Sequence, residues 1–227
     1  MVTFLIKANH PTILTVKWKI RKNKIINMNR FYLELSFGII STILFGCEGD
    51  EYKQANQFFE QGQYEKAIDQ YDQFLEYKPD HVESIYNKGR AFEELGEFEK
   101  SLASYEKTLE IEPKNVNALM SLGKHYFRNE NYQDAAFYFS KASKVQKNNA
   151  QAHFYSARSL HKSGNTDKAM DAYNDAISMN KDMGEAYLYR GALKVYLGKK
   201  SAGCNDFKLA SSLGVEEAAN AQNQYCK

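Results

Sequence analysis

The sequence predicts an all-α protein in which a two-helix unit is repeated five times to form a solenoid. Apolar positions recur every three to four residues after position 50, which is typical of amphipathic helices. The same pattern of small and aromatic residues returns every 34 residues, and a fixed period of this size indicates a repeat array. The 227 residues include only three prolines, and they lack the β-branched runs of a sheet protein.

The first element, residues 1–46, is predicted to be a targeting segment outside the fold. A basic stretch precedes residues 31–46, which are apolar apart from Glu34 and too few to cross a bilayer comfortably as a permanent helix. A short apolar core between a positive flank and a small residue is typical of a secretory signal. Residues 1–27 have no evident fold, and we interpret them as an over-extended start because translation from Met28 would give a signal of ordinary length.

This segment ends in the sequence LFGC at residues 44–47, which resembles a bacterial lipobox. In that motif the chain is cleaved before an invariant cysteine that carries lipid, so the resemblance implies a lipid-modified Cys47. Phe45 departs from the motif, because it is bulkier than the residue usual before the glycine. An uncleaved anchor and a buried free thiol at Cys47 are the alternatives.

The second element is an array of five repeats, whose boundaries follow from self-comparison at a shift of 34 residues: 48–81, 82–115, 116–149, 150–183 and 184–217. Small residues at positions 8 and 20 of each repeat allow two helices to approach closely. Position 24 is always aromatic, and its ring is expected to fill the space between one hairpin and the next. These aromatic residues are Tyr71, Tyr105, Phe139, Tyr173 and Phe207.

These positions are those of the tetratricopeptide repeat (TPR), and residues 48–215 resemble that family in register five times. The resemblance implies a right-handed α-solenoid of five TPR helix hairpins. In four repeats a glycine is expected to end the first helix in a left-handed conformation. Repeat three has Glu130 at this position, and repeats three and four have Lys147 and Lys181 where repeats one and two have a proline, so looser turns are expected there.

The third element is a capping helix within residues 215–227, which is expected to cover the apolar face of the last hairpin. Cys204 lies early in the second helix of repeat five, and Cys226 lies at the end of the cap. An exported protein meets oxidising conditions, and an antiparallel return of the cap would bring the two residues within reach. The sequence therefore predicts a disulfide between them, with two buried free cysteines as the alternative.

The TPR resemblance also implies that the first helices line a concave groove. Position 5 of each repeat is mostly aromatic and position 9 is mostly basic, and the two positions lie one helical turn apart. Arg90, Lys124 and Arg158 form a ladder of cations, which is unfavourable without a partner and is therefore interpreted as a ligand feature. For the aromatic residues, packing between adjacent first helices is the alternative. The predicted peptide-binding residues are Tyr52, Asn56, Tyr86, Asn87, Arg90, Lys124, Phe127, Arg128, Phe154, Tyr155, Arg158 and His161.

The charge of the chain is divided unevenly. Seven of the 30 basic and one of the 28 acidic side chains lie in residues 1–46, so residues 47–227 carry a formal net charge of −4. An acidic body argues against nucleic-acid binding. A basic groove on such a body is expected to attract an acidic segment or a free carboxy terminus of a protein. A carboxylate clamp for chaperone tails is disfavoured, because Tyr52, Asn117 and Ser121 stand where its cations belong.

Signatures of catalysis and metal binding are missing from the sequence. The five histidines show no HExxH spacing, no cysteine pair has a CxxC interval, and there is no glycine-rich phosphate loop or GxSxG motif. We therefore expect no enzyme activity, cofactor or metal.

The predicted function is a protein-interaction scaffold, lipid-anchored to the outer membrane of a bacterial envelope on its periplasmic or surface face. The alternative is a structural subunit of an outer-membrane assembly or secretion machine. The chain resembles the TPR lipoproteins of such machines in its size and in the implied lipid modification. Repeats one and two are close to consensus, which favours the scaffold. Glycan capture is disfavoured, because the TPR lipoproteins of sugar uptake are much longer.

Overall fold

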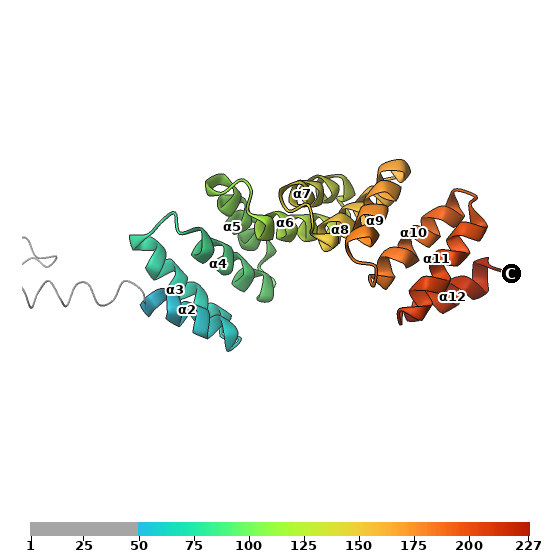
Figure 1. Ribbon diagram of the computed structural model, residues 1–227. Helices are drawn as coiled ribbons and strands as arrows, with labels where there is room; N and C mark the ends of the chain where they lie inside the picture. The colour runs from blue at the N-terminus through green and yellow to red at the C-terminus, as the bar shows by residue number, and fades with distance from the viewer. Residues whose placement is uncertain (1–49) are drawn as a thin grey trace, which may run out of the picture. The chain divides into compact units, whose positions relative to one another are not determined.

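The structure is a computed structural model that describes residues 50–227 (Figure 1). The described residues belong to one compact unit. The predicted targeting segment, the lipobox and Cys47 lie outside the described residues.

Residues 50–227 form eleven α-helices and no strand. The helices are α2 (Asp50–Glu60), α3 (Tyr64–Tyr77), α4 (Val82–Glu94), α5 (Phe98–Ile111), α6 (Val116–Arg128), α7 (Tyr132–Val145), α8 (Ala150–Lys162), α9 (Thr166–Met179), α10 (Gly184–Tyr196), α11 (Lys200–Ser212) and α12 (Glu216–Tyr225). No helix in this part of the chain is long and apolar enough to span a membrane.

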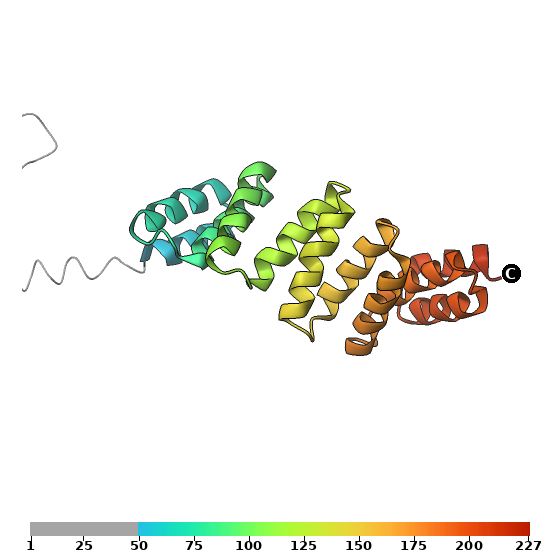
Figure 2. The same cartoon turned by 90° about the horizontal axis from the view of Figure 1, so that it is seen from above.

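The helices pack in the order of the sequence. Each even-numbered helix from α2 to α10 pairs with the helix that follows it, and each pair contacts the next (Figures 1 and 2). The last helix, α12, packs on α11 and α10. This arrangement of five hairpins and a final helix within residues 50–227 confirms the predicted all-α solenoid.

The core of each hairpin is an aromatic ring seated on a small residue. The position 24 side chains Tyr71, Tyr105, Phe139, Tyr173 and Phe207 are at most 1% exposed. A Cβ atom added to Gly123 would lie 2.6 Å from Cε1 of Phe139, which is closer than real Cβ contacts. The ring therefore lies mainly within its own hairpin, and it also reaches the next first helix, where Phe139 and Tyr155 stack with centroids 5.2 Å apart. The expected contact with the next hairpin is therefore present at Phe139, and the contact within the hairpin is an addition to the prediction.

The turn between the two helices of a hairpin has one geometry throughout repeats one to five. The glycines Gly62, Gly96, Gly164 and Gly198 have φ between 71° and 82°, as predicted. Glu130 takes the same left-handed conformation with φ of 58°. Its turn keeps the backbone hydrogen bond from Asn131 to Tyr126 at 2.9 Å, which matches the bond from Glu97 to Phe92 in repeat two. The prediction of a looser turn at Glu130 is wrong, because packing of the hairpin holds the turn geometry against the preference of the residue.

The turns between hairpins are also alike, with or without a proline. In repeat two, which has Pro113, Asn115 donates its backbone N–H to Glu112 at 3.0 Å. In repeat three, which has Lys147, Asn149 donates to Gln146 at the same distance, and repeat four keeps the equivalent bond from Met183 to Asn180 at 3.3 Å. The expectation of looser turns at Lys147 and Lys181 is therefore also wrong.

The C-terminal end of the solenoid is held by polar contacts that the other hairpins lack. Asp206 on α11 is 3% exposed, and its carboxylate accepts two hydrogen bonds from Arg190 at 2.8 and 2.9 Å. Lys194 adds an ion pair to the same carboxylate at 2.7 Å, which explains a lysine at a usually apolar position. A buried carboxylate needs such compensation, and the two cations provide it, so loss of either cation would leave a buried charge without its full set of partners.

The cap is joined to this hairpin covalently. Cys204 on α11 and Cys226 at the end of α12 form a disulfide with Cα atoms 5.7 Å apart. Lys200 also donates a hydrogen bond to the carbonyl of Lys227 at 2.8 Å. Both contacts tie the terminal turn to the start of α11.

We predict that Glu130→Gly stabilises the fold. A left-handed conformation costs a non-glycine residue about 1–2 kcal/mol, and the greater freedom of glycine in the unfolded chain cancels about half of the gain. The free energy of unfolding of fragment 48–227, measured with urea, should rise by about 0.5–1 kcal/mol. Glu130→Ala is the control, because it removes the same charge and keeps the strain. An equal gain in both variants would contradict the explanation.

We also predict that the cysteines of the oxidised protein are paired. Fragment 48–227, unfolded without reductant, should show no reactive thiol, whereas two reactive thiols per chain would contradict the bridge. Cys204→Ser should lower the free energy of unfolding by about 3 kcal/mol, because the disulfide closes a loop with a sequence separation of 22. In reductant, the variant and the unchanged fragment should unfold alike.

Candidate functional site

The first helices α2, α4, α6 and α8 carry the predicted binding residues, and we call the surface that they form together with α10 the first-helix face. Side chains connect neighbouring first helices across this face. Asn87 on α4 donates to Asn56 on α2 at 3.3 Å, and the guanidinium of Arg158 on α8 lies 4.4 Å from the ring centroid of Tyr189 on α10. In both contacts, position 9 of one repeat meets position 6 of the next, as the 34-residue period requires.

In repeats one and two, predicted binding residues contact other side chains of the protein. Asn56 also accepts a hydrogen bond from the hydroxyl of Tyr71 at 2.5 Å. Tyr86 lies 3.4 Å from the hydroxyl of Ser121 and packs on Tyr105. Tyr52 packs on the rings of Phe74 and His81, and burial raises the pKa of its hydroxyl. These contacts serve packing between adjacent helices, which was the alternative interpretation of the aromatic residues.

Two members of the predicted cation ladder have partners inside the protein. The guanidinium of Arg90 lies 4.4 Å from the ring centroid of Phe59 in the preceding repeat. Arg158 contacts Phe127 of its preceding repeat at 5.1 Å in addition to Tyr189. Such cation–π contacts are worth about 0.5–2 kcal/mol. The expectation that the whole ladder requires an external partner is therefore corrected for Arg90 and Arg158.

Lys124 differs from the two arginines of the ladder. It is exposed, and it makes no hydrogen bond, ion pair or ring contact with any residue in 50–227. The ammonium group of Lys124 is therefore available to a ligand.

Glu93 on α4 links this helix to α5 and α6 through hydrogen bonds. Its carboxylate accepts a hydrogen bond from the Tyr105 hydroxyl at 2.7 Å and from Arg128 on α6 at 2.6 Å. Burial, followed by the hydrogen bond and negative charge of Glu93, raises the pKa of Tyr105, so the hydroxyl stays protonated as a donor. Arg128 also lies over the ring of Phe98 at 5.4 Å, so this predicted ligand residue is already engaged.

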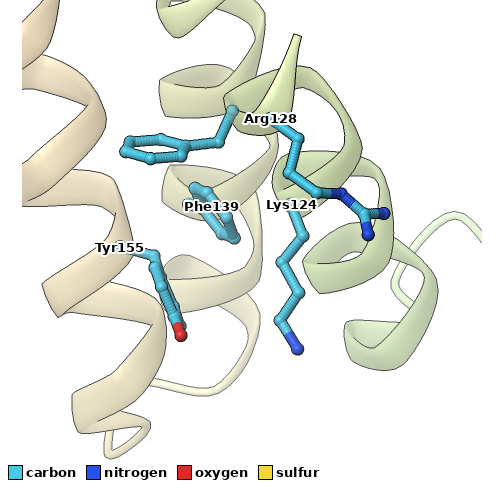
Figure 3. Close-up of a pocket in the computed structure, with 5 residues that line it drawn as sticks. Lys124, Arg128, Phe139 and Tyr155 are labelled. Atoms are coloured by element: carbon cyan, nitrogen blue, oxygen red, sulfur yellow. The ribbon is translucent and has the colours of Figure 1, made fainter. Parts of the chain in front are cut away.

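A pocket of about 180 Å³ lies between α6, α7 and α8, and we call it the first groove pocket (Figure 3). Its lining includes the stacked rings of Phe139 and Tyr155, with Lys124 on α6 beside them, while the guanidinium of Arg128 points away from these rings (Figure 3). No carboxylate lines it. The lining residues are Lys124, Phe127, Arg128, Phe139 and Tyr155.

A second pocket, of about 350 Å³, lies between α8, α9 and α10, and we call it the second groove pocket. It also combines cations with aromatic rings and has no carboxylate in its lining. The lining residues are Arg158, His161, Lys162, Tyr173 and Tyr189.

His161 and Tyr173 are the two side chains of the second groove pocket whose pKa values are shifted. The Tyr173 hydroxyl lies 3.5 Å from Nδ1 of His161. Burial, together with the charge of neighbouring Lys162, lowers the pKa of His161, and burial raises that of Tyr173. Near neutral pH both side chains are therefore uncharged, and the positive charge of this pocket comes from Arg158 and Lys162.

The sequence prediction includes many of the residues that line the two pockets, but it lacks Tyr189, which lines the second pocket, and Glu93, which bonds to Arg128 of the first. Tyr189 occupies position 6 of repeat five, and the predicted residues Asn87 and Tyr155 at position 6 of repeats two and four were the available signal for it. Glu93 occupies position 12 of repeat two, where repeats one and three have an aromatic residue. The break in the pattern at Glu93 was the available signal. Within residues 50–227, no group of three or more His, Cys, Asp or Glu side chains is arranged to hold a metal ion.

Comparisons with known proteins agree with this architecture. The tetratricopeptide repeat family model matches residues 52–116 and 120–187, which together make up more than half of the chain. None of the curated protein sequences matches.

Several solved structures superpose on most of the chain. YrrB, a TPR protein with an unusual peptide-binding site, has a TM-score of 0.70 at 19% identity, over 81% of this chain and 97% of that one. MamA has a TM-score of 0.66 at 22% identity, over 73% and 96%. MamA from Desulfovibrio magneticus RS-1 has a TM-score of 0.68 at 16% identity, over 74% and 96%. At these identities the similarity concerns the fold alone.

Proposed function

The chain belongs to the tetratricopeptide-repeat family, and we propose that it is a protein-interaction scaffold whose first-helix face binds an acidic segment of a partner protein. The observation that carries the proposal is the composition of the two groove pockets, which pair cations with aromatic rings and include no carboxylate. Charge-assisted hydrogen bonds to a carboxylate are strong in such surroundings, and the rings can hold the apolar parts of the ligand.

The charge of the rest of the protein supports the same ligand. Residues 47–227 have a formal net charge of −4, so an acidic segment would be repelled from the general surface and attracted to the pockets. The solved structure of YrrB is described as having a peptide-binding site, which is consistent with peptide binding on this fold. No catalytic role is part of the proposal.

We further propose that the scaffold is lipid-anchored through Cys47 in a bacterial envelope, at the outer membrane. The support is the basic and apolar segment that ends in the sequence LFGC. The first described helix begins at Asp50, close behind Cys47. An anchor at Cys47 would therefore hold the N-terminal hairpin near the membrane and leave the later repeats free to bind.

Neutralising the cation ladder should weaken partner capture. The variant Arg90→Gln, Lys124→Gln, Arg158→Gln, made in the affinity-tagged full chain, should retain about tenfold less of any specific partner from a detergent-solubilised envelope extract, since each exposed charge pair contributes about 0.2–1 kcal/mol. The difference should shrink as salt rises, because exposed charges are screened within about 10 Å at 0.1 M salt.

The matched control neutralises three cations on second helices, Lys66→Gln, Lys100→Gln and Lys168→Gln, which share position 19 of their repeats and are exposed. This control should capture the partner as the unchanged chain does. Equal capture by both triple variants at low salt would contradict binding on the first-helix face.

Replacing Cys47 should abolish lipid modification. In bacteria fed an alkyne fatty acid, the full chain should incorporate the label, whereas Cys47→Ala should accumulate as an unlabelled, unprocessed precursor. The double variant Cys204→Ser, Cys226→Ser should still be labelled. Unchanged labelling of Cys47→Ala would rule out the anchor.

A further inference from the structure

The two groove pockets are copies of one site, built from the same positions of consecutive repeats. Every residue that lines the second pocket lies 34 positions after its counterpart in the first. Each pocket has cations at positions 9 and 13, a ring at position 12, the buried ring at position 24, and a tyrosine at position 6 of the following repeat. The inference developed from this match rests on the proposed function and specifies its ligand.

The same positions in repeats one and two have a different chemistry. Position 13 is Glu60 in repeat one and Glu94 in repeat two, and the tyrosine of position 6 is replaced by Asn87 and Ser121. Asn56 and Glu93 there are already bonded within the protein. A carboxylate ligand would therefore meet acidic or occupied groups in the N-terminal half of the face and cations in the C-terminal half.

Arg158 lines the second groove pocket and also contacts a ring that lines the first. Its guanidinium lies 5.1 Å from the ring centroid of Phe127 of the first pocket and 4.4 Å from that of Tyr189 of the second. These rings contact the guanidinium and fix its position, and the side chain makes no hydrogen bond or ion pair with any residue in 50–227. Its N–H groups remain free for a carboxylate. The contact between Arg158 and Phe127 places the two pockets next to each other.

Each pocket also has a cation with no partner among the described residues. In the first it is Lys124, and in the second it is Lys162, which is exposed and makes no hydrogen bond or ion pair with them. Two adjacent pockets with available cations can each take one carboxylate from the same ligand.

The repeat spacing determines how far apart those carboxylates should be. Arg158 on α8 contacts Phe127 on α6, so we take the spacing of the two pockets to be about the interaxial distance of packed helices, 8–10 Å. A polyproline II segment advances about 3.1 Å per residue with three residues per turn. Side chains three residues apart in such a segment therefore point in the same direction about 9 Å apart. We propose that the ligand is an extended segment with two acidic side chains three residues apart, one bound in each groove pocket.

Three synthetic peptides test this inference. All are acetylated, amidated and fluorescein-labelled, so that they have no free carboxy terminus. One contains Glu-Pro-Pro-Glu, its isomer contains Glu-Glu-Pro-Pro, and the third contains Glu-Pro-Pro-Gln. With the full chain in mild detergent and low salt, fluorescence anisotropy should show Glu-Pro-Pro-Glu binding about tenfold more tightly than the other two, since a hydrogen bond to a charged group is worth about 1.5–3 kcal/mol. Equal binding of the isomer, or no binding of any peptide, would overturn the inference.

Single substitutions locate the site. Lys124→Gln should reduce binding of Glu-Pro-Pro-Glu to the level of the single-acid peptide, and Arg158→Gln should reduce it at least as much. Lys66→Gln is the control, because it removes an exposed cation on the second helix α3, outside both pockets, and it should change the affinity less than twofold. A loss with Lys66→Gln equal to that with Lys124→Gln would refute the two-pocket site but leave the proposed scaffold function standing. Partner capture that is insensitive to the ladder variant would instead contradict binding of a partner on the first-helix face.

Discussion

A buried aromatic ring seated on a residue with little or no side chain holds each hairpin together, and the rest of the solenoid depends on this contact. The position 24 rings are at most 1% exposed in all five repeats, and at Gly123 even a Cβ atom would collide with the ring. Because the contact recurs every 34 residues, neighbouring hairpins are built alike. Equivalent side chains therefore meet equivalent surroundings, which is why two pockets of the same composition occur side by side.

The same constraint explains which local preferences the protein can override. Glu130 adopts a left-handed conformation that favours glycine, because a different turn would separate its helix from the ring that it covers. The C-terminal end has no further hairpin to pack against, and a different set of interactions closes it. Arg190 and Lys194 neutralise buried Asp206, and the disulfide joins the cap to α11.

On the first-helix face, some polar side chains are hydrogen-bonded within the protein, and others are available to a ligand. In repeats one and two the asparagines, the glutamate and the tyrosine hydroxyls satisfy one another. In repeats three and four the position 12 and 13 side chains are aromatic or basic, and no carboxylate lines the pockets between them. A buried hydrogen bond that is already made is costly to exchange, so ligand binding is expected where cations remain unpaired.

The sequence alone determined the fold, because the 34-residue period and its small and aromatic positions admit one way of burying the apolar surface. It also placed nearly all of the pocket residues on the first helices. Only the tertiary structure decided which of them are available. Arg90 and Lys124 are equivalent in sequence, yet Arg90 stacks on Phe59 of the preceding repeat. The corresponding residue before Lys124 is Glu93, which is engaged by Arg128 and Tyr105. Such pairings depend on side chains from three or more helices meeting in space, and no single repeat records them.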